Sequence, residues 1–247
     1  MTWEGENAAL IQRLDKILAS TGKWSRREVK QLVRQGRVLA DGRPAGGPEE
    51  KYDPDTAEIT VDGEPIGYRR VTWLMMNKPA GVLSATEDGR GATVLDLLPP
   101  ELRRIGLFPV GRLDKDTEGL LLLTNDGEEA HRLLSPRHHV DKVYFTRVAG
   151  RLEPADAEAF RQGMILGDGL HCLPSELEIL QAGETSEAHV TLREGKFHQV
   201  KRMLAARGKP VTYLQRVRMG NLTLDPALQL GKFRFLTSEE LEILKNS

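Results

Sequence analysis

Hydrophobic residues near the start of the chain have the spacing of one helix face. Apolar positions between residues 14 and 18 predict a short helix that ends near Gly22. Ser25 and Glu28 have capping-box spacing, in which each side chain bonds the other residue's backbone N–H. A second helix is therefore predicted to begin at Ser25 and to end at Gly36, a residue type that commonly terminates helices.

Two short strand signals follow these helices. Residues 37–40 are a β-favouring stretch that an Asp-Gly pair follows at 41–42, and residues 59–66 repeat the signal around the Asp-Gly pair at 62–63. Asp-Gly favours the tight turn of a β-hairpin, because both of its residues tolerate positive φ. The pattern predicts a compact helix–helix–hairpin unit over residues 11–67, preceded by a loose tail over residues 1–10.

The rest of the chain mixes strand and helix signals without a regular βαβ order. Strands are predicted at residues 73–76, 120–124, 142–148, 187–192 and 232–235. Helices are predicted at residues 94–98, 128–134, 154–162 and 200–207, with a last one opening at Thr237. This mixture predicts an α+β domain with a largely antiparallel sheet over residues 71–247.

Charge is distributed unevenly along the chain. Of 247 residues, 29% are charged and the net charge is −1, yet residues 11–47 carry +6 and residues 193–218 carry +7. We call these stretches the first and second basic islands. Two basic islands on an acidic remainder favour a polyanion bound at two places. The alternative for each island, a solvated charged helix face, stays open.

Several classes of protein are not supported by the sequence. No stretch approaches the roughly 20 apolar residues of a membrane span, and the acidic start lacks the apolar core of a signal peptide. Cys172 is the only cysteine, so an intrachain disulfide and a cysteine zinc site are excluded. A cytoplasmic protein is expected. Serine-hydrolase, phosphate-loop and dinucleotide motifs are absent.

The densest cluster of charge is the segment 111–119, Gly-Arg-Leu-Asp-Lys-Asp-Thr-Glu-Gly, which an apolar run of four leucines follows. A charged loop fixed to a buried strand can hold one reactive side chain still. Asp114 and Asp116 could be the paired carboxylates of a hydrolase. The charges could also only cap a turn.

A calcium loop is a further alternative for this segment. Asp114, Asp116 and Glu118 fall at the first, third and fifth positions of an EF-hand loop. The twelfth position, where a bidentate glutamate is needed, is Asn125. The calcium interpretation is therefore weak.

Two other segments point to nucleic acid. In Ser-Pro-Arg-His-His, residues 135–139, the adjacent histidines lack the spacing of a helical zinc pair, so contact with phosphates or base edges is favoured over a plain surface loop. Residues 194–204 run from a glycine turn into a helix rich in cations. Such a helix start presents N–H groups and positive charge to phosphates, although an ordinary amphipathic helix would explain its apolar positions.

Four ordered segments of the chain resemble the motifs of RNA pseudouridine synthases. They are Asn-Lys-Pro-Ala-Gly at 77–81, Gly-Arg-Leu-Asp with Asp-Thr and Gly-Leu at 111–120, Lys-Val-Tyr at 142–144, and Gly-Lys-Phe-His-Gln-Val-Lys-Arg-Met at 195–203. The 135–139 loop looks most like the RsuA-type branch, which modifies 16S ribosomal RNA. Residues 13–60 resemble the S4-like (alpha-L) RNA-binding domain that this branch carries.

The resemblance implies an enzyme that isomerises uridine to pseudouridine without a cofactor or a metal. Asp114 would be the catalytic carboxylate, acting on the sugar as nucleophile or base. Lys201 would keep Asp114 ionised, and Tyr144 would stack on the target base. Arg112 would fill the space that the flipped uridine vacates. The site modified in this branch is uridine 516 of 16S RNA.

Further residues are expected to contact RNA through phosphates or base edges. They are Arg13, Lys16, Arg26, Arg27, Lys30, Arg137, His138, Lys196, His198, Gln199 and Arg202. The expected partner is 16S ribosomal RNA, either naked or in a pre-ribosomal particle. The protein is expected to be a monomer without a membrane partner.

Two rival functions remain at this point. One is a pseudouridine synthase for 23S ribosomal RNA, against which the 135–139 loop argues. The other is a non-catalytic, ribosome-associated RNA-binding protein that uses the same basic segments.

Overall fold

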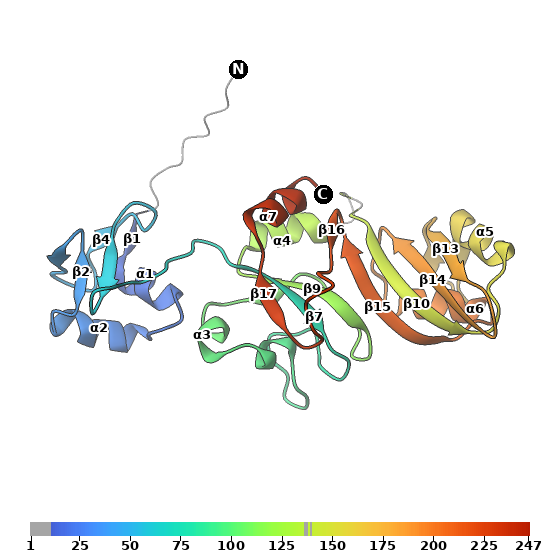
Figure 1. The fold of residues 1–247 in the computed structure, drawn as a ribbon, viewed down its shortest axis with the longest axis horizontal. Coiled ribbons are helices and arrows are strands. Elements are labelled where there is room, and N and C mark those ends of the chain that lie inside the picture. Colours follow the sequence, from blue (N-terminus) through green and yellow to red (C-terminus); the bar gives the residue numbers. More distant parts are fainter. Residues whose placement is uncertain (1–10, 136–137, 139) are drawn as a thin grey trace, which may run out of the picture. The chain divides into compact units, whose positions relative to one another are not determined.

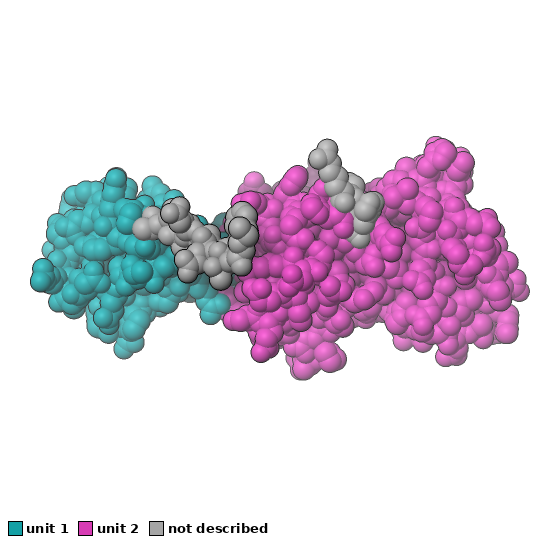
Figure 2. Space-filling view, turned by 90° about the horizontal axis from the view of Figure 1, so that it is seen from above, with its two compact units in different colours: residues 1–72, 98–107 teal, residues 73–97, 108–247 magenta. Residues whose placement is uncertain are grey.

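The computed structural model describes residues 11–135, 138 and 140–247. The chain forms two compact units (Figure 2). The first contains residues 1–72 and 98–107, and the second contains residues 73–97 and 108–247. The predicted tail, residues 1–10, lies outside the described residues. Within the described residues, no helix is both long and apolar enough to cross a membrane.

The first unit is built around a small core between two helices and short strands. Its helices are α1 (Leu14–Ser20), α2 (Arg26–Arg34) and α3 (Pro100–Arg103). Its strands are β1 (Gln12–Arg13), β2 (Val38–Ala40), β3 (Arg43–Pro44), β4 (Lys51–Tyr52), β5 (Ile59–Val61) and β6 (Glu64–Pro65). One sheet has the order β3-β2-β5-β6, and β1 pairs with β4.

Local sequence signals account for most of this unit. The Ser25 side chain accepts a bond from the N–H of Glu28, whose carboxylate accepts from the N–H of Ser25, so the predicted capping box is present. Asp41 and Asp62, the first residues of the two Asp-Gly pairs, both have positive φ, as the predicted turns require.

The second unit is organised by one mixed sheet (Figure 1). Its path is β13-β14-β10-β15-β9-β7-β17, with β16 beside β15 and β8 beside β9. The strands are β7 (Trp73–Lys78), β8 (Phe108–Pro109), β9 (Glu118–Thr124), β10 (Lys142–Ala149), β13 (Glu176–Gln181), β14 (Thr185–Leu192), β15 (Val211–Met219), β16 (Leu222–Thr223) and β17 (Phe233–Phe235). A separate short pair joins β11 (Met164–Ile165) to β12 (His171–Cys172).

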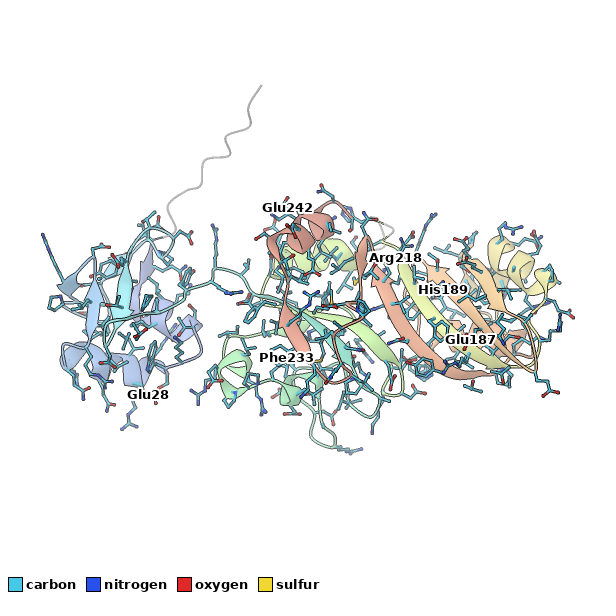
Figure 3. The ribbon with its side chains drawn as sticks, in the orientation of Figure 1. Glu28, Glu187, His189, Arg218, Phe233 and Glu242 are labelled. Carbon is cyan, nitrogen blue, oxygen red and sulfur yellow. The ribbon has the colours of Figure 1, made fainter. Side chains whose placement is uncertain are left out.

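Helices cover parts of this sheet. They are the 3-10 turn η1 (Val94–Leu97), α4 (Gly127–Leu134), α5 (Pro154–Gln162), α6 (Gln199–Ala206) and α7 (Ser238–Lys245). α4 and α7 lie together in Figure 1 and share a core cluster with β7 and β9. Along β14, Glu187 and His189 alternate with buried residues, as expected for a strand with one covered face (Figure 3).

The two halves of the sheet meet at a short parallel seam between β9 and β15. Only Gln215 with Glu118 and Arg216 with Gly119 pair there, and every other neighbouring pair in the sheet is antiparallel. The Arg216 guanidinium donates to the carbonyl of Leu120 at 2.8 Å. The hydroxyl of Tyr213 donates to Glu118 at 2.8 Å.

The predicted α+β fold class is confirmed, because the structure combines a small unit of helices and short strands with a mixed, largely antiparallel sheet. The predicted strands and helices appear close to their expected positions. Of the strands longer than two residues, two were missed, β13 and the central β15. The short helix α3 and the two-residue strands β1, β4, β8, β11, β12 and β16 were also not predicted. β15 carries polar or charged residues at both covered and open positions, so its sequence does not alternate as a half-buried strand should.

Candidate active site

The charged loop leads into β9 and is clamped from the segment that follows β7. The hydroxyl of Ser84, a buried residue, donates to the carbonyl of Leu113 at 2.9 Å and accepts from the N–H of Leu113 at 3.1 Å. The N–H of Gly81 donates to the carbonyl of Lys115 at 2.8 Å. These bonds hold the backbone on both sides of Asp114.

Lys78, at the end of β7, holds the same loop from beneath. Its side chain is fully buried, and its ammonium group lies within hydrogen-bond distance of four carbonyls, those of Pro79 (2.9 Å), Asp114 (3.1 Å), Lys115 (3.3 Å) and Thr117 (2.9 Å). Burial lowers the pKa of Lys78 to about 8. Neither Lys78 nor Ser84 was predicted from the sequence to have a role. A lysine in an otherwise buried strand was the available signal.

Lys201, on α6, reaches Asp114 as the resemblance implied. Its Nζ lies 3.1 Å from Oδ2 of Asp114 and 2.5 Å from Oδ1 of Asp116. Burial alone would lower the pKa of Lys201, but the bonds to the two carboxylates outweigh it and raise that pKa. The bond from Lys201 also lowers the pKa of Asp116. The sequence did not predict that Asp116 shares this lysine.

His198 lies on the other side of Asp114. Its Nε2 is 3.6 Å from Oδ1 of Asp114, and its ring stacks on the Phe197 ring with a centroid distance of 3.8 Å. His198 is the residue that precedes α6, and it has a φ of +50°, a left-handed conformation that few side chains adopt. Such strained conformations cluster at functional sites.

Asp114 faces a small hollow into which several of the predicted residues project. It is lined by Arg112, Leu113, Asp114, Thr117, Tyr144, Leu192, Gly195, Lys196, His198, Gln199, Val200 and Leu214. Tyr144, on β10, is 9% exposed, and the Asp114 side chain is 25% exposed. The hollow therefore offers one carboxylate beside the Tyr144 ring, among both polar and apolar side chains, with a cation bound to that carboxylate.

Other predicted residues lie elsewhere. Arg137 lies outside the described residues, as does part of the 135–139 loop. His138 is exposed, and it is absent from the lining of the Asp114 hollow. Gln199 is 3% exposed, and its side chain bonds Glu194 at 2.6 Å and the N–H of Lys196 at 3.1 Å. Its amide thus shapes the turn that precedes α6.

The second basic island is less positive at the surface than its sequence indicates. Most of its cations are bound to carboxylates, and Arg216 is only 2% exposed. The ion pairs are Arg193 with Asp141, Lys196 with Glu194, Lys201 with Asp114 and Asp116, Arg202 with Asp168, and Arg207 with Asp156. The charge of +7 counted along the chain therefore overstates the positive charge available to RNA. The acids that compensate it come mainly from distant segments.

The first basic island keeps more of its positive charge free. Arg13 makes a paired contact with Asp15, the shorter bond being 2.9 Å. By contrast Lys16, Arg26, Arg27 and Lys30 are exposed, and no described carboxylate forms an ion pair with them. α2 buries Val29, Leu32 and Val33, so its cations lie on the opposite, solvated face.

A calcium loop is not supported by the geometry. The segment after Glu118 is strand β9, where an EF-hand would need a helix. In the part of the chain that the structure describes, no group of three or more His, Cys, Asp or Glu residues could hold a metal ion. Cys172 is buried and free.

Comparison with known proteins agrees with the motifs. A family model described as RNA pseudouridylate synthase matches residues 72–206, and the S4 domain model matches residues 12–56. A solved crystal structure of a pseudouridylate synthase aligns with a TM-score of 0.66 and 34% identity. The match covers 94% of this chain and 99% of that one.

Curated relatives align along nearly their whole length. The ribosomal small subunit pseudouridine synthases A of Vibrio cholerae and Escherichia coli are 40% and 37% identical. Each alignment covers 93% of this chain, with 97% and 98% of the respective relative. A Bacillus subtilis protein, "Uncharacterized RNA pseudouridine synthase YtzG", is 52% identical over 94% of this chain and 98% of its own length. Together with the order of the four motif segments around Asp114, this similarity means that the chain belongs to the RNA pseudouridine synthase family, with an S4 domain at its N-terminus.

Proposed function

We propose that the protein converts one uridine of the small-subunit ribosomal RNA to pseudouridine, with Asp114 as its catalytic carboxylate. The observation that carries the proposal is the placement of Asp114 in the hollow, bonded to Lys201 and beside Tyr144. The small-subunit substrate is supported by the Vibrio cholerae and Escherichia coli relatives, whose names specify that subunit. Following the branch that the chain resembles, we propose uridine 516 as the nucleotide.

The reaction needs a carboxylate but no redox partner. The bond from C1′ of the ribose to N1 of uracil breaks, a bond from C1′ to C5 forms, C5 loses a proton and N1 gains one. Asp114 would attack C1′ as a nucleophile or remove the proton from C2′ as a base. In either case the carboxylate must be ionised before the reaction begins.

Lys201 supports that ionised state. A nearby cation favours the charged form of a carboxylate, and the Lys201 ammonium is 3.1 Å from Oδ2 of Asp114. The same ammonium holds Asp116, which is 74% exposed. Lys201 would therefore orient Asp114 while remaining anchored to the loop at two points.

Tyr144 and Arg112 would act on the two sides of base flipping, Tyr144 on the flipped base and Arg112 on the RNA that it leaves. The target uridine must leave its stacked position to reach Asp114, which costs a few kcal/mol. The Tyr144 ring, on the floor of the hollow, would stack on the flipped base and help to remove the C5 proton. Arg112 is exposed at the rim and would occupy the space left in the RNA.

The direct test is the Asp114→Asn variant, which keeps the size of the side chain and removes its negative charge. We expect pseudouridine formation on 16S RNA to be lost while RNA affinity stays within about twofold of the wild type. The matched control is Asp116→Asn, which removes a carboxylate from the same loop and should retain activity. Full activity in Asp114→Asn would support the rival interpretation as a non-catalytic RNA-binding protein.

The substrate is tested by mapping pseudouridines across all ribosomal RNA with and without the gene. Loss of one modification in 16S RNA, at uridine 516, is expected. Loss of a modification in 23S RNA instead would show that the large-subunit rival is correct. Naked 16S RNA and pre-ribosomal particles are compared as substrates in the same assay.

We also propose that the enzyme acts in the cytoplasm as a monomer. Within the chain itself, Asp114, Tyr144 and His198 already meet in one hollow. Sedimentation of the free protein tests this proposal, and a dimer at working concentration would contradict it.

A further inference from the structure

Phe197 is the most exposed of the large hydrophobic side chains in the described residues, at 70%. It lies next to His198, whose Nε2 is 3.6 Å from Asp114. A single exposed aromatic ring is common on protein surfaces, so the significance of Phe197 lies in its position. Its place beside the catalytic carboxylate makes the RNA substrate the natural cover.

The Phe197 ring is stacked on one side and exposed on the rest. One face stacks on the His198 ring at 3.8 Å with an interplanar angle of 19°. The Arg202 side chain lies 3.5 Å from the backbone carbonyl of Phe197, a long contact that restrains the turn. Since the ring remains largely exposed with one face covered, its other face is open.

The backbone at His198 adopts an energetically unfavourable conformation. His198 has a φ of +50°, which a non-glycine residue adopts only when its surroundings impose it. The N–H of Lys196 is held by the buried Gln199 side chain, which fixes the turn from the inside. At this left-handed residue the His198 ring stacks on Phe197, and its Nε2 lies 3.6 Å from Asp114.

Phe197 also borders a second, broader hollow of about 550 Å³. Its lining consists of Leu166, Gly167, Asp168, Phe197, Arg202, Ala205 and Ala206. The walls are mostly small or apolar, and the only charged groups are Arg202 and Asp168, which pair with each other. Such a wall suits the flat apolar face of a nucleobase better than a phosphate.

Positive charge alone would not give the rim around Phe197 an affinity for RNA. Lys196 pairs with Glu194, and Arg202 pairs with Asp168, so the rim is nearly neutral. The Asp168 side chain is 62% exposed, and such surface ion pairs contribute little, so Arg202 can exchange Asp168 for a phosphate at small cost. The specific feature of the rim is its open aromatic face.

We propose that Phe197 is a stacking platform for one unpaired nucleobase adjacent to the target uridine, and that the hollow beside it receives that base. Flipping a uridine into the Asp114 hollow leaves its neighbours partly unstacked. A neighbour that stacks on Phe197 would continue the column formed by the Phe197 and His198 rings. Aromatic platforms hold single-stranded bases in this way, largely independent of base identity.

The inference rests on the proposed function, so its test measures binding separately from activity. The proteins carry Asp114→Asn to prevent turnover, and the RNA is a 16S fragment that contains uridine 516, the proposed target. Phe197→Ala and Phe197→Leu remove the aromatic face, whereas Phe197→Tyr keeps it. Far-UV circular dichroism and thermal unfolding verify folding, which these exposed substitutions should leave unchanged.

We expect Phe197→Ala and Phe197→Leu to weaken RNA binding by about 5- to 100-fold, and Phe197→Tyr to stay near the parent. RNAs with an abasic nucleotide at each position next to the uridine are then compared. At one position the abasic RNA should bind the parent weakly and lose nothing further with Phe197→Ala. 2-Aminopurine at that position should be quenched on binding by the parent and not by Phe197→Ala.

Two outcomes would overturn the platform. One is an undiminished affinity of Phe197→Ala. The other is an equal loss of affinity for every abasic RNA, which would mean that no single base uses the ring. If the platform is found but the wild type forms no pseudouridine on any ribosomal RNA, the proposed function fails and the stacking site stands.

Discussion

A single ammonium group, that of Lys201, serves two carboxylates that lie two residues apart. The Asp116 side chain is 74% exposed, so water can readily replace its bond to Lys201. The Asp114 side chain is more enclosed, at 25% exposed. We expect Lys201→Met to reduce kcat by on the order of 100-fold, since the enclosed carboxylate loses the ammonium group that is bound to it. Lys201→Arg should retain most activity because it keeps the charge. Single-turnover assays on 16S RNA make the comparison, and equal rates for Lys201→Met and the wild type would contradict the role.

Lys142, two residues before Tyr144, makes the free energy of unfolding vary with pH in the alkaline range. Its Nζ donates to the carbonyl of Val140 at 2.8 Å, and burial lowers the pKa of Lys142 from 10.5 to about 8. Between these pH values the unfolded chain holds a proton that the folded chain has released, so stability rises with pH by at most about 1.4 kcal/mol per unit.

Urea unfolding between pH 8 and 10 measures this contribution. Lys142→Met should show a shallower rise in the free energy of unfolding than the wild type. The exposed Lys51→Met variant should keep the wild-type slope. Lys78, whose pKa is also lowered to about 8, adds a similar term to all three proteins and cancels in the comparison. Parallel slopes for the wild type and Lys142→Met would show that Lys142 stays protonated in the folded protein.

At the scale of elements, the β9–β15 seam brings the catalytic groups together. Asp114 precedes β9, whereas Tyr144 and Lys201 belong to elements on the β15 side of the seam. Gly119 has a φ of +101°, and a Cβ on it would lie 2.3 Å from the carbonyl oxygen of Arg216. A side chain at this position must therefore push the two strands apart.

We expect Gly119→Ala to lower the free energy of unfolding by about 3 kcal/mol or more, and to lower kcat as well. The matched control is Gly208→Ala, which also has positive φ but open space around its Cβ. It should cost only about 1 to 2 kcal/mol and leave kcat unchanged. Equal losses in the two variants would mean that close packing at the seam is unimportant.

The sequence predicted elements whose signals are local and missed those whose identity depends on distant partners. The capping box at Ser25 and the Asp-Gly turns are local, and the structure confirms them. β15 is a strand because β10 and β9 flank it, and its polar residues give no periodic signal. Likewise, the link from Lys201 to Asp116 and the bonds of Lys78 to the loop depend on how the chain packs. The motif order alone could not reveal them.

At the scale of the whole molecule, the first basic island keeps more unpaired cations than the second among the residues that the structure describes. We expect the triple variant Arg26→Gln, Arg27→Gln, Lys30→Gln to weaken RNA binding for all sequences alike. The slope of log affinity against log salt should become shallower by about 2 to 3, given about 0.7 to 0.9 for each of the three phosphates that the variant no longer neutralises. Arg161→Gln removes a cation that is paired with Glu158 on α5, and should leave the slope unchanged. An unaltered slope in the triple variant would mean that the exposed face of α2 does not contact the RNA.

The position of β15 in the sheet has a consequence for the order of events during synthesis. The strand between β10 and β9 is made after both of them, so the half-sheets remain separate until residues 211–219 have left the ribosome. The S4 unit, apart from residues 98–107, is complete long before then and can fold first, as N-terminal domains generally do. A nascent chain could thus hold RNA before it can modify it, and stalled or truncated products that end before β15 would be binders without activity.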